Sequence, residues 1–235
     1  NSILGYGMSL ASAAGVREIQ KKRTISIMGD GGFWHNGLQS GVLSALFNEG
    51  DAILIIMQNG YSSATGQQNI PSSRSRTNNR AITGEIERTL KSLGVAWLKT
   101  IRTYSVDVMV DTLREAMTTD FNGLKVIIAD GECMLARQRR LKTDNALKLE
   151  SGIRFETPRF GIDDEVCTGD HSCIRLSGCP SLTIKPNPDP LRTDPVAHVN
   201  NGCVGCGLCG EVSHAAVLCP SFYKAERVQN AGLIE

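Results

Sequence analysis

Short apolar runs alternate with amphipathic stretches over the first two-thirds of the chain. Four runs are rich in β-branched residues, as strands buried on both faces tend to be: TISIM (24–28), AILIIM (52–57), VAWLKTI (95–101) and LKVIIAD (124–130). Helical patterns lie between these runs. The alternation predicts an α/β fold in which a parallel sheet carries helices on both sides.

Two of the helical patterns are well defined. In NGLQSGVLSALFNEG (36–50), apolar positions recur at helical spacing and Gly50 marks the end. In SVDVMVDTLREAMTTD (105–120), Ser105 is a candidate N-cap. The apolar face of that second helix is expected at Val106, Val110, Leu113 and Met117. A charged stretch, 136–152, is expected to be a partly helical bridge.

The character of the sequence changes after this bridge. Proline, glycine and cysteine dominate, and KPNPDPLRTDP (185–195) has too many prolines for a helix or a central strand. We therefore predict two domains, 1–152 and 153–235. A second domain this small cannot bury a large apolar core, so it needs metals or other cross-links. Its cysteine runs, 167–180 and 203–220, resemble each other, which indicates an internal duplication.

Composition narrows the function. A net charge of +1 over 235 residues argues against general binding of nucleic acid or of a membrane surface. No apolar run approaches the roughly 18 residues of a membrane span. The first residues have neither a basic region nor an initiator methionine, so we expect a segment of a longer, cytoplasmic multidomain chain rather than a signal peptide.

Seven of the eight cysteines follow residue 166. Without an export signal, this enrichment favours metal ligation over a disulfide framework. The remaining one, Cys133, follows a predicted strand and is expected to be a buried or partly exposed thiol rather than a ligand.

Polar clusters follow two of the predicted strands. SIM runs into Gly29-Asp30-Gly31, and a later strand runs into MQNGYSSATGQQ (57–68). The carboxyl ends of parallel strands are where open α/β sheets bind ligands. There, Asp30 and Asn59 can hold Mg²⁺, which bridges to a diphosphate, while the two glycines admit the phosphates. A lone GDG also makes an ordinary turn, and it is the second cluster that favours the site.

This pair of motifs resembles the thiamin diphosphate signature. The resemblance implies that Asp30, Asn59 and the carbonyl of Tyr61 bind Mg²⁺. Gln58 departs from the family, which often has a second asparagine there. Around the diphosphate we expect Gly29, Gly31, Ser62, Thr65 and Gly66. His35 is a tentative catalytic residue that could equally be structural, and the small residues of GYGMSLASAAG (5–15) would let a helix pack closely beneath the cofactor.

The cysteine runs resemble those of bacterial two-cluster ferredoxins. CVGCGLC (203–209) has the spacing of an iron–sulfur run, but nine residues separate it from Cys219-Pro220 where three are usual. The first run places Asp170 in the slot of a cysteine. In those ferredoxins the fourth cysteine of each run serves the other cluster. One [4Fe–4S] cluster would then use Cys179, Cys203, Cys206 and Cys209, and the other Cys167, Asp170, Cys173 and Cys219.

Asp170 makes the second of these sites unusual. Oxygen binds iron less well than thiolate does, so this cluster could lose one iron and become [3Fe–4S]. His171 is the next candidate ligand if Asp170 points away. Two tetrahedral zinc sites are the alternative use of these cysteines, and the paired Cys-Pro steps favour clusters instead.

Both halves together resemble the 2-oxoacid:ferredoxin oxidoreductases, most closely the long, fused bacterial indolepyruvate type. The resemblance rests on GDGGFWHNG, QNGYSSATGQQ and CTGDHSCIRLSGCPSL…CVGCGLC. It implies oxidative decarboxylation of an aryl 2-oxoacid to the acyl-CoA, with coenzyme A as cosubstrate and ferredoxin as electron acceptor. The runners-up are a pyruvate- or 2-oxoglutarate-type enzyme and a non-catalytic ferredoxin-like electron carrier.

The same resemblance implies missing parts. The glutamate that activates the cofactor belongs to a pyrimidine-binding domain, and no such domain is found in this sequence. We therefore expect that domain, and a gamma-type domain, elsewhere in the chain or in other subunits, in a dimer or larger assembly.

Overall fold

The computed structural model describes residues 5, 7–20, 22–73, 85–207, 209 and 219–232. It divides into two compact units, Asn1–Ala136 and Arg137–Glu235, each of which is described by itself. The charged stretch expected to be partly helical is the helix α6, Met134–Glu150, most of which belongs to the second unit. Among the described residues, no helix combines the length and apolar character that a membrane span requires.

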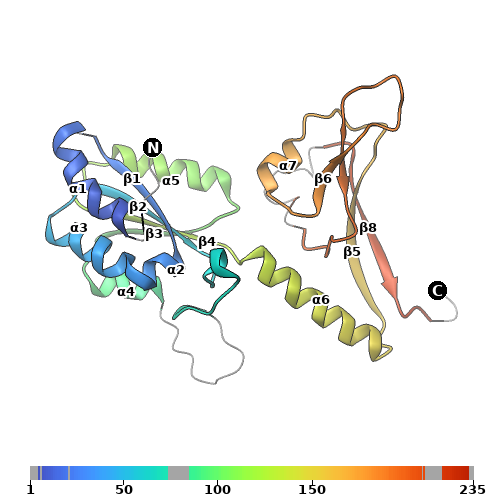
Figure 1. The fold of residues 1–235 in the computed structure, drawn as a ribbon, viewed down its shortest axis with the longest axis horizontal. Helices are drawn as coiled ribbons and strands as arrows, with labels where there is room; N and C mark the ends of the chain where they lie inside the picture. The colour runs from blue at the N-terminus through green and yellow to red at the C-terminus, as the bar shows by residue number, and fades with distance from the viewer. Residues whose placement is uncertain are drawn as a thin grey trace. The chain divides into compact units, whose positions relative to one another are not determined.

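The first unit is a four-stranded parallel sheet with helices on both faces (Figure 1). Its strands are β1 (Thr24–Gly29), β2 (Ala52–Gln58), β3 (Trp97–Arg102) and β4 (Lys125–Asp130), in the order β1-β2-β4-β3. Its helices are α1 (Met8–Gln20), α2 (Asp30–Gly32), η1 (Phe33–Leu43), α3 (Ser44–Phe47), α4 (Ile86–Ser92) and α5 (Val106–Thr118), with a 3₁₀ turn η2 (Ser63–Thr65). The predicted α/β class and the four predicted strands are confirmed.

One face of the sheet packs on α1, α4 and the helix that follows β1. Its core includes Leu54 and Ile56 of β2 and Val126 and Ile128 of β4, all fully or almost fully buried. The opposite face is smaller: Ile53 and Ile127 pack there against α5. Figure 1 shows α5 on the other side of the sheet from α3 and α4. Alternate residues of β2, β3 and β4 therefore serve two different cores.

Strand β1 departs from the prediction that its two faces are buried. Ser26 and Met28 are buried, but Ile25 and Ile27 are 49% and 57% exposed. The cause is its position: β1 is the edge strand farthest from β3, and the cluster under α5 draws its strand residues from β2, β3 and β4. Strand pattern alone does not reveal which strand lies at the edge.

Helix α5 begins after Ser105 as predicted, but the predicted buried face is right only at Leu113. Val106, Val110 and Met117 are exposed, whereas Thr112 and Ala116 are buried. Met109 and Leu113 pack beside Ala116 on the sheet. The helix is apolar on more than one side, so periodicity alone could not select the side that faces the sheet.

The helix after β1 runs without a break from Asp30 to Phe47. Its middle segment η1 has π-type hydrogen bonding, a rare geometry that is frequent at functional sites. This helix lies in close contact with the residues before α1, and the contact depends on Gly7. A Cβ on Gly7, whose φ is +78°, would lie 2.9 Å from the Cα of Gly37. The expected close packing of the small-residue segment is therefore found.

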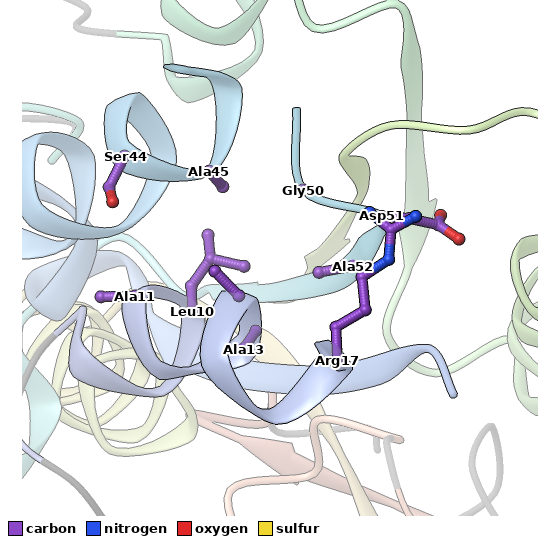
Figure 2. Close-up of a pocket in the computed structure, with 10 residues that line it drawn as sticks. Leu10, Ala11, Ala13, Arg17, Ser44, Ala45, Gly50, Asp51 and Ala52 are labelled. Atoms are coloured by element: carbon purple, nitrogen blue, oxygen red, sulfur yellow. The ribbon is translucent and has the colours of Figure 1, made fainter. Parts of the chain in front are cut away.

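Small side chains also bring α1 against the start of β2. Ala11 and Ala13 of α1 lie here with Ala45 and Ala52, and Figure 2 shows Leu10 of α1 directed toward Ala45. They enclose a cavity of about 10 Å³, which is no more than one water molecule needs. This region is packing rather than a ligand site.

The second unit contains two antiparallel strand pairs. β5 (Phe155–Ile162) pairs with β8 (Phe222–Gln229), and β6 (Leu182–Lys185) pairs with β7 (Val196–Val199). A short helix, α7 (Ser172–Ser177), precedes β6. Its buried cores are small and lined by cysteines: Cys209 lies with Leu182 and Phe222, and Cys167 with Val196 and Ala197.

Hydrogen bonds repeat between the halves of this unit, in agreement with the predicted duplication. The amide of Asp163, after β5, donates to the carbonyl of Ser221 (2.8 Å), and that of Asn200, after β7, donates to the carbonyl of Ser181 (2.9 Å). Each of these serines follows a Cys-Pro step and is buried. The Cys-Pro step of the second run is thus joined to β5, which precedes the first run. The Cys-Pro step of the first run is joined to β7, which precedes the second run. The nine residues before Cys219 lie outside the described part.

Candidate functional site

The sheet places Asp30 and Asn59 together. Gly29 of β1 is in register with Met57 of β2, so the residues that follow lie at one edge. Asp30 is 1% exposed. Its Oδ2 accepts hydrogen bonds from the backbone amides of Asn59 (2.9 Å) and Gly60 (2.7 Å), and its Oδ1 accepts one from Gly31 (2.9 Å). The carboxylate thus joins the ends of two neighbouring strands.

The electrostatic state of Asp30 is a balance between burial and these amides. Burial raises the pKa of Asp30, and the backbone hydrogen bonds from Gly60, Asn59 and Gly31 oppose that rise. In the described part of the chain its hydrogen-bond partners are backbone amides, and no cationic side chain is found among them. A bound divalent cation would favour the ionised form of such a carboxylate.

The two glycines that flank Asp30 differ in their surroundings. A Cβ added to Gly31 would lie 2.9 Å from Ser62 Oγ and 3.2 Å from Ser62 Cα. A Cβ added to Gly29 would meet nothing within 4 Å. Gly31 is therefore needed for packing within the protein, whereas Gly29 faces open space at the same edge.

The loop after β2 is held by its own polar groups. Asn59 Oδ1 accepts from the amide of Tyr61 (3.0 Å), and the amide oxygen keeps a second lone pair. The Thr65 hydroxyl lies 3.1 Å from that of Ser62, which is buried. Gly66 has φ of +97°, a left-handed turn that suits glycine. The predicted diphosphate-binding residues therefore cluster around Asp30, and their ligand roles stay predictions.

Three other residues complete this edge. The Gln58 amide donates to Asp130 Oδ1 (2.8 Å), so its side chain is directed to β4 rather than to Asp30. Cys133 is half-buried, as expected, and its amide donates to the carbonyl of Asn59 (3.2 Å). The sequence pattern did not predict that Cys133 holds the Asn59 backbone. Its position after the end of a predicted strand is the signal that could have indicated this contact. His35 is exposed, and its catalytic role stays a prediction.

The late cysteines gather in two sets, each drawn from both runs. Burial raises the pKa of Cys173, and the nearby thiols of Cys219 and Cys167 raise it further. Burial likewise raises the pKa of Cys179, and Cys206 and Cys203 add to the effect. These neighbours match the predicted exchange of the fourth cysteine between runs. The ligand sets themselves stay predictions.

The first set lines a cavity of about 280 Å³. Its walls include Cys167, Cys173 and Cys219, together with Asp170 and His171. Within the described ranges, no three histidine, cysteine or acidic side chains converge as on a single metal ion.

Asp170 and His171 are placed differently in that wall. Asp170 is exposed, its Oδ1 accepts from the amide of Ser172 (2.9 Å), and this hydrogen bond lowers the pKa of Asp170. His171 has φ of +58°, and its Nε2 atom is buried. Sequence spacing did not distinguish the two environments.

Known proteins resemble the chain over most of its length. The family model described as thiamine pyrophosphate enzyme, C-terminal TPP binding domain, matches residues 1–129. The chain belongs to this family. Thiamine pyrophosphate is another name for thiamin diphosphate, so the family that the Asp30 and Asn59 motifs indicate is confirmed.

Relatives extend the likeness into the second unit. The indolepyruvate oxidoreductase subunit IorA of Pyrococcus horikoshii is 25% identical over 215 residues, 89% of this chain and 31% of the relative. That of Archaeoglobus fulgidus is 29% identical over 207 residues, 88% of this chain and 30% of the relative. These relatives confirm the resemblance to the indolepyruvate type. This thiamine pyrophosphate enzyme chain spans about a third of their length.

A solved structure also matches in part. The 2-oxoglutarate:ferredoxin oxidoreductase from Magnetococcus marinus, with 2-oxoglutarate, coenzyme A and succinyl-CoA bound, has a TM-score of 0.46 and 15% identity. The match covers 58% of this chain and 51% of that chain.

The residues present fit the groups that this family implies. The buried Asp30 carboxylate, without a cationic partner among the described residues, fits a Mg²⁺ ligand, and the open space at Gly29 fits a diphosphate. In the second unit, a buried ring nitrogen and three thiols around one cavity fit an iron–sulfur cluster.

Proposed function

We propose that this chain is the cofactor-anchoring and electron-transfer segment of a 2-oxoacid:ferredoxin oxidoreductase that acts on an aryl 2-oxoacid such as indolepyruvate. The observation that carries the proposal is the joining of Asp30 to the end of β2 in a chain that also gathers its late cysteines in two sets. The relatives' names favour indolepyruvate over pyruvate or 2-oxoglutarate.

In the first unit, Asp30, Asn59 and the Tyr61 carbonyl would hold Mg²⁺, and the cation would hold the diphosphate. Gly29 leaves room for the phosphates, and Ser62, Thr65 and Gly66 form the loop beside them. When bound, thiamin diphosphate supplies an electron sink for the loss of CO₂ from the 2-oxoacid. The protein's task is to fix its position and to exclude water from it.

In the second unit, two [4Fe–4S] clusters would carry the electrons in a ferredoxin-like domain. One takes Cys179, Cys203, Cys206 and Cys209. The other takes Cys167, Cys173 and Cys219, and spacing alone assigns its fourth position to Asp170. Two electrons leave the substrate, one to each of two ferredoxins, and coenzyme A accepts the acyl group. Ligation of iron by cysteines suits a reducing compartment such as the cytoplasm.

The remaining two-thirds of the enzyme would supply the other domains. Relatives named as a subunit imply a multi-subunit enzyme, and we place the pyrimidine-binding and gamma-type domains outside this segment. A non-catalytic electron carrier is the rival function. An electron carrier would not need the buried Asp30 carboxylate to join two strand ends beside the open space at Gly29.

The experiment that tests the proposal uses the full-length protein, purified without oxygen. We expect about eight iron and eight acid-labile sulfide per chain, Mg²⁺-dependent binding of thiamin diphosphate, and ferredoxin reduction that requires indolepyruvate and coenzyme A. Iron without thiamin diphosphate binding would identify an electron carrier. A preference for pyruvate or 2-oxoglutarate would replace the proposed substrate and leave the reaction class intact.

A further inference from the structure

The cavity of about 280 Å³ in the second unit has three thiols and no fourth cysteine in its described wall. Cys167 and Cys173 come from the first run and Cys219 from the second. A [4Fe–4S] cluster has four irons and takes four ligands. Among the described residues, the candidates for the fourth ligand are therefore the other polar side chains of this wall, Asp170 and His171.

Asp170 already has a structural task. Its carboxylate is exposed to solvent, and Oδ1 accepts the amide hydrogen of Ser172, the first residue of α7. An aspartate in that position satisfies an amide that the helix itself leaves without a partner. Its presence at residue 170 is explained without a metal.

His171 has the opposite properties. Its ring atom Nε2 is buried and has no hydrogen-bond partner in the part of the chain that the structure describes. A buried polar atom without a partner destabilises the folded state. His171 is among the residues that line the same cavity as the three thiols.

The backbone of His171 also carries a cost. Its φ of +58° and ψ of 22° are left-handed, a conformation that is unfavourable for a residue other than glycine. The His171 carbonyl accepts the amides of Ile174 and Arg175 (3.0 Å each), so this conformation starts α7. Strained residues of this kind persist where the surroundings require them, and they cluster at ligand sites.

We propose that His171, through Nε2, is the fourth ligand of the cluster held by Cys167, Cys173 and Cys219, in place of Asp170. The inference rests on the proposed function in that a cluster occupies this cavity. A neutral imidazole with its proton on Nδ1 has a lone pair on Nε2, and imidazole suits iron. Histidine replaces cysteine in this manner in Rieske centres and raises their reduction potential.

The decisive measurement is the nitrogen coupling of the reduced cluster. The full-length protein is produced with ¹⁵N-histidine, purified without oxygen, and compared with unlabelled protein by pulsed EPR. We expect a nitrogen coupling that changes with the isotope and disappears in His171→Ala. Because the unique iron then loses its ligand, iron content should fall from about eight to about seven per chain.

Two further variants separate ligation from folding. His171→Cys should restore the iron, show no histidine nitrogen coupling and lower the potential of this one cluster, since thiolate is anionic. Asp170→Asn keeps an oxygen for the Ser172 amide and should leave both coupling and iron content unchanged. The EPR signal of the other cluster serves in each variant as the internal control for a folded unit.

Four results would overturn the inference. Full clusters without a histidine coupling would exclude His171 as the ligand. Loss of iron in Asp170→Asn but not in His171→Ala would assign the position to Asp170. Unchanged iron in both variants with no histidine coupling would assign it to solvent, and a coupling that persists in His171→Ala would assign it to another histidine. A protein without iron would instead refute the proposed function, and the inference with it.

Discussion

The Asp30 carboxylate accepts the backbone amide of Asn59 at 2.9 Å and so links the ends of β1 and β2. We expect Asp30→Asn in the full-length protein to weaken Mg²⁺-dependent binding of thiamin diphosphate about 100-fold, or about 2.8 kcal/mol. The reason is the loss of the one buried anion at the proposed metal site. Calorimetry measures the affinity, and Asp130→Asn is the control, because that carboxylate ends the next strand but is exposed. Equal affinities for Asp30→Asn and the parent would contradict the site.

Gly29 and Gly31 provide a matched pair of substitutions. Gly31→Ala places a Cβ 2.9 Å from Ser62 Oγ and should lower the free energy of unfolding by about 1–3 kcal/mol. Gly29→Ala meets no heavy atom within 4 Å at φ of −79°, so stability should not fall. The new methyl group should instead weaken thiamin diphosphate binding about tenfold or more. Denaturant unfolding and calorimetry distinguish the two effects, and loss of stability in Gly29→Ala would argue against an open diphosphate site.

Asp51 forms a buried ion pair with Lys125, whose side chain is fully buried. We expect Asp51→Asn to cost about 3–5 kcal/mol of unfolding free energy, because the Lys125 charge loses its anionic partner. The exposed Lys99–Glu115 pair offers a control, and Glu115→Gln should cost less than about 1 kcal/mol. Urea unfolding measures both.

The same pair predicts a pH dependence. Burial would raise the pKa of Asp51, but hydrogen bonds from Lys125 and Arg23 outweigh it and hold the pKa below its usual value of 3.8. The folded pKa thus lies below the unfolded one, so the stabilisation is present above pH 3.8 and is lost as pH falls through the folded value. The stability difference between the parent and Asp51→Asn should shrink below pH 3.8. A difference that stays constant there would show that the pair does not govern the effect.

Cys179 tests the exchange of ligands between the cysteine runs. Although it lies in the first run, its thiol neighbours Cys206 and Cys203 of the second. We expect Cys179→Ser to alter the EPR spectrum of the cluster at Cys203 and to leave the cluster at Cys167 intact. Cys133→Ser, outside both runs, should leave the iron content unchanged. A change confined to the Cys167 cluster would mean that each run serves its own site.

Sequence pattern was sufficient for the parts of the fold that depend on near neighbours. Strand composition located the four strands, and the rule that parallel strands end at one edge brought Asp30 next to Asn59. The Cys-Pro steps and doubled runs indicated two sets of thiols. These are properties of local periodicity and of spacing along the chain.

Other features arise only when distant segments pack. No pattern shows that α5 buries Ala116 rather than Val106, or that Lys125 within a strand is paired with Asp51. Likewise, spacing selected Asp170 for the fourth cluster position, whereas the fold buries the ring nitrogen of the adjacent His171. The sequence by itself determined which residue types are available and where strands and helices begin. Only the tertiary structure decided which of them face a core, a cavity or water, because burial and charge pairing depend on contacts between residues far apart in the chain.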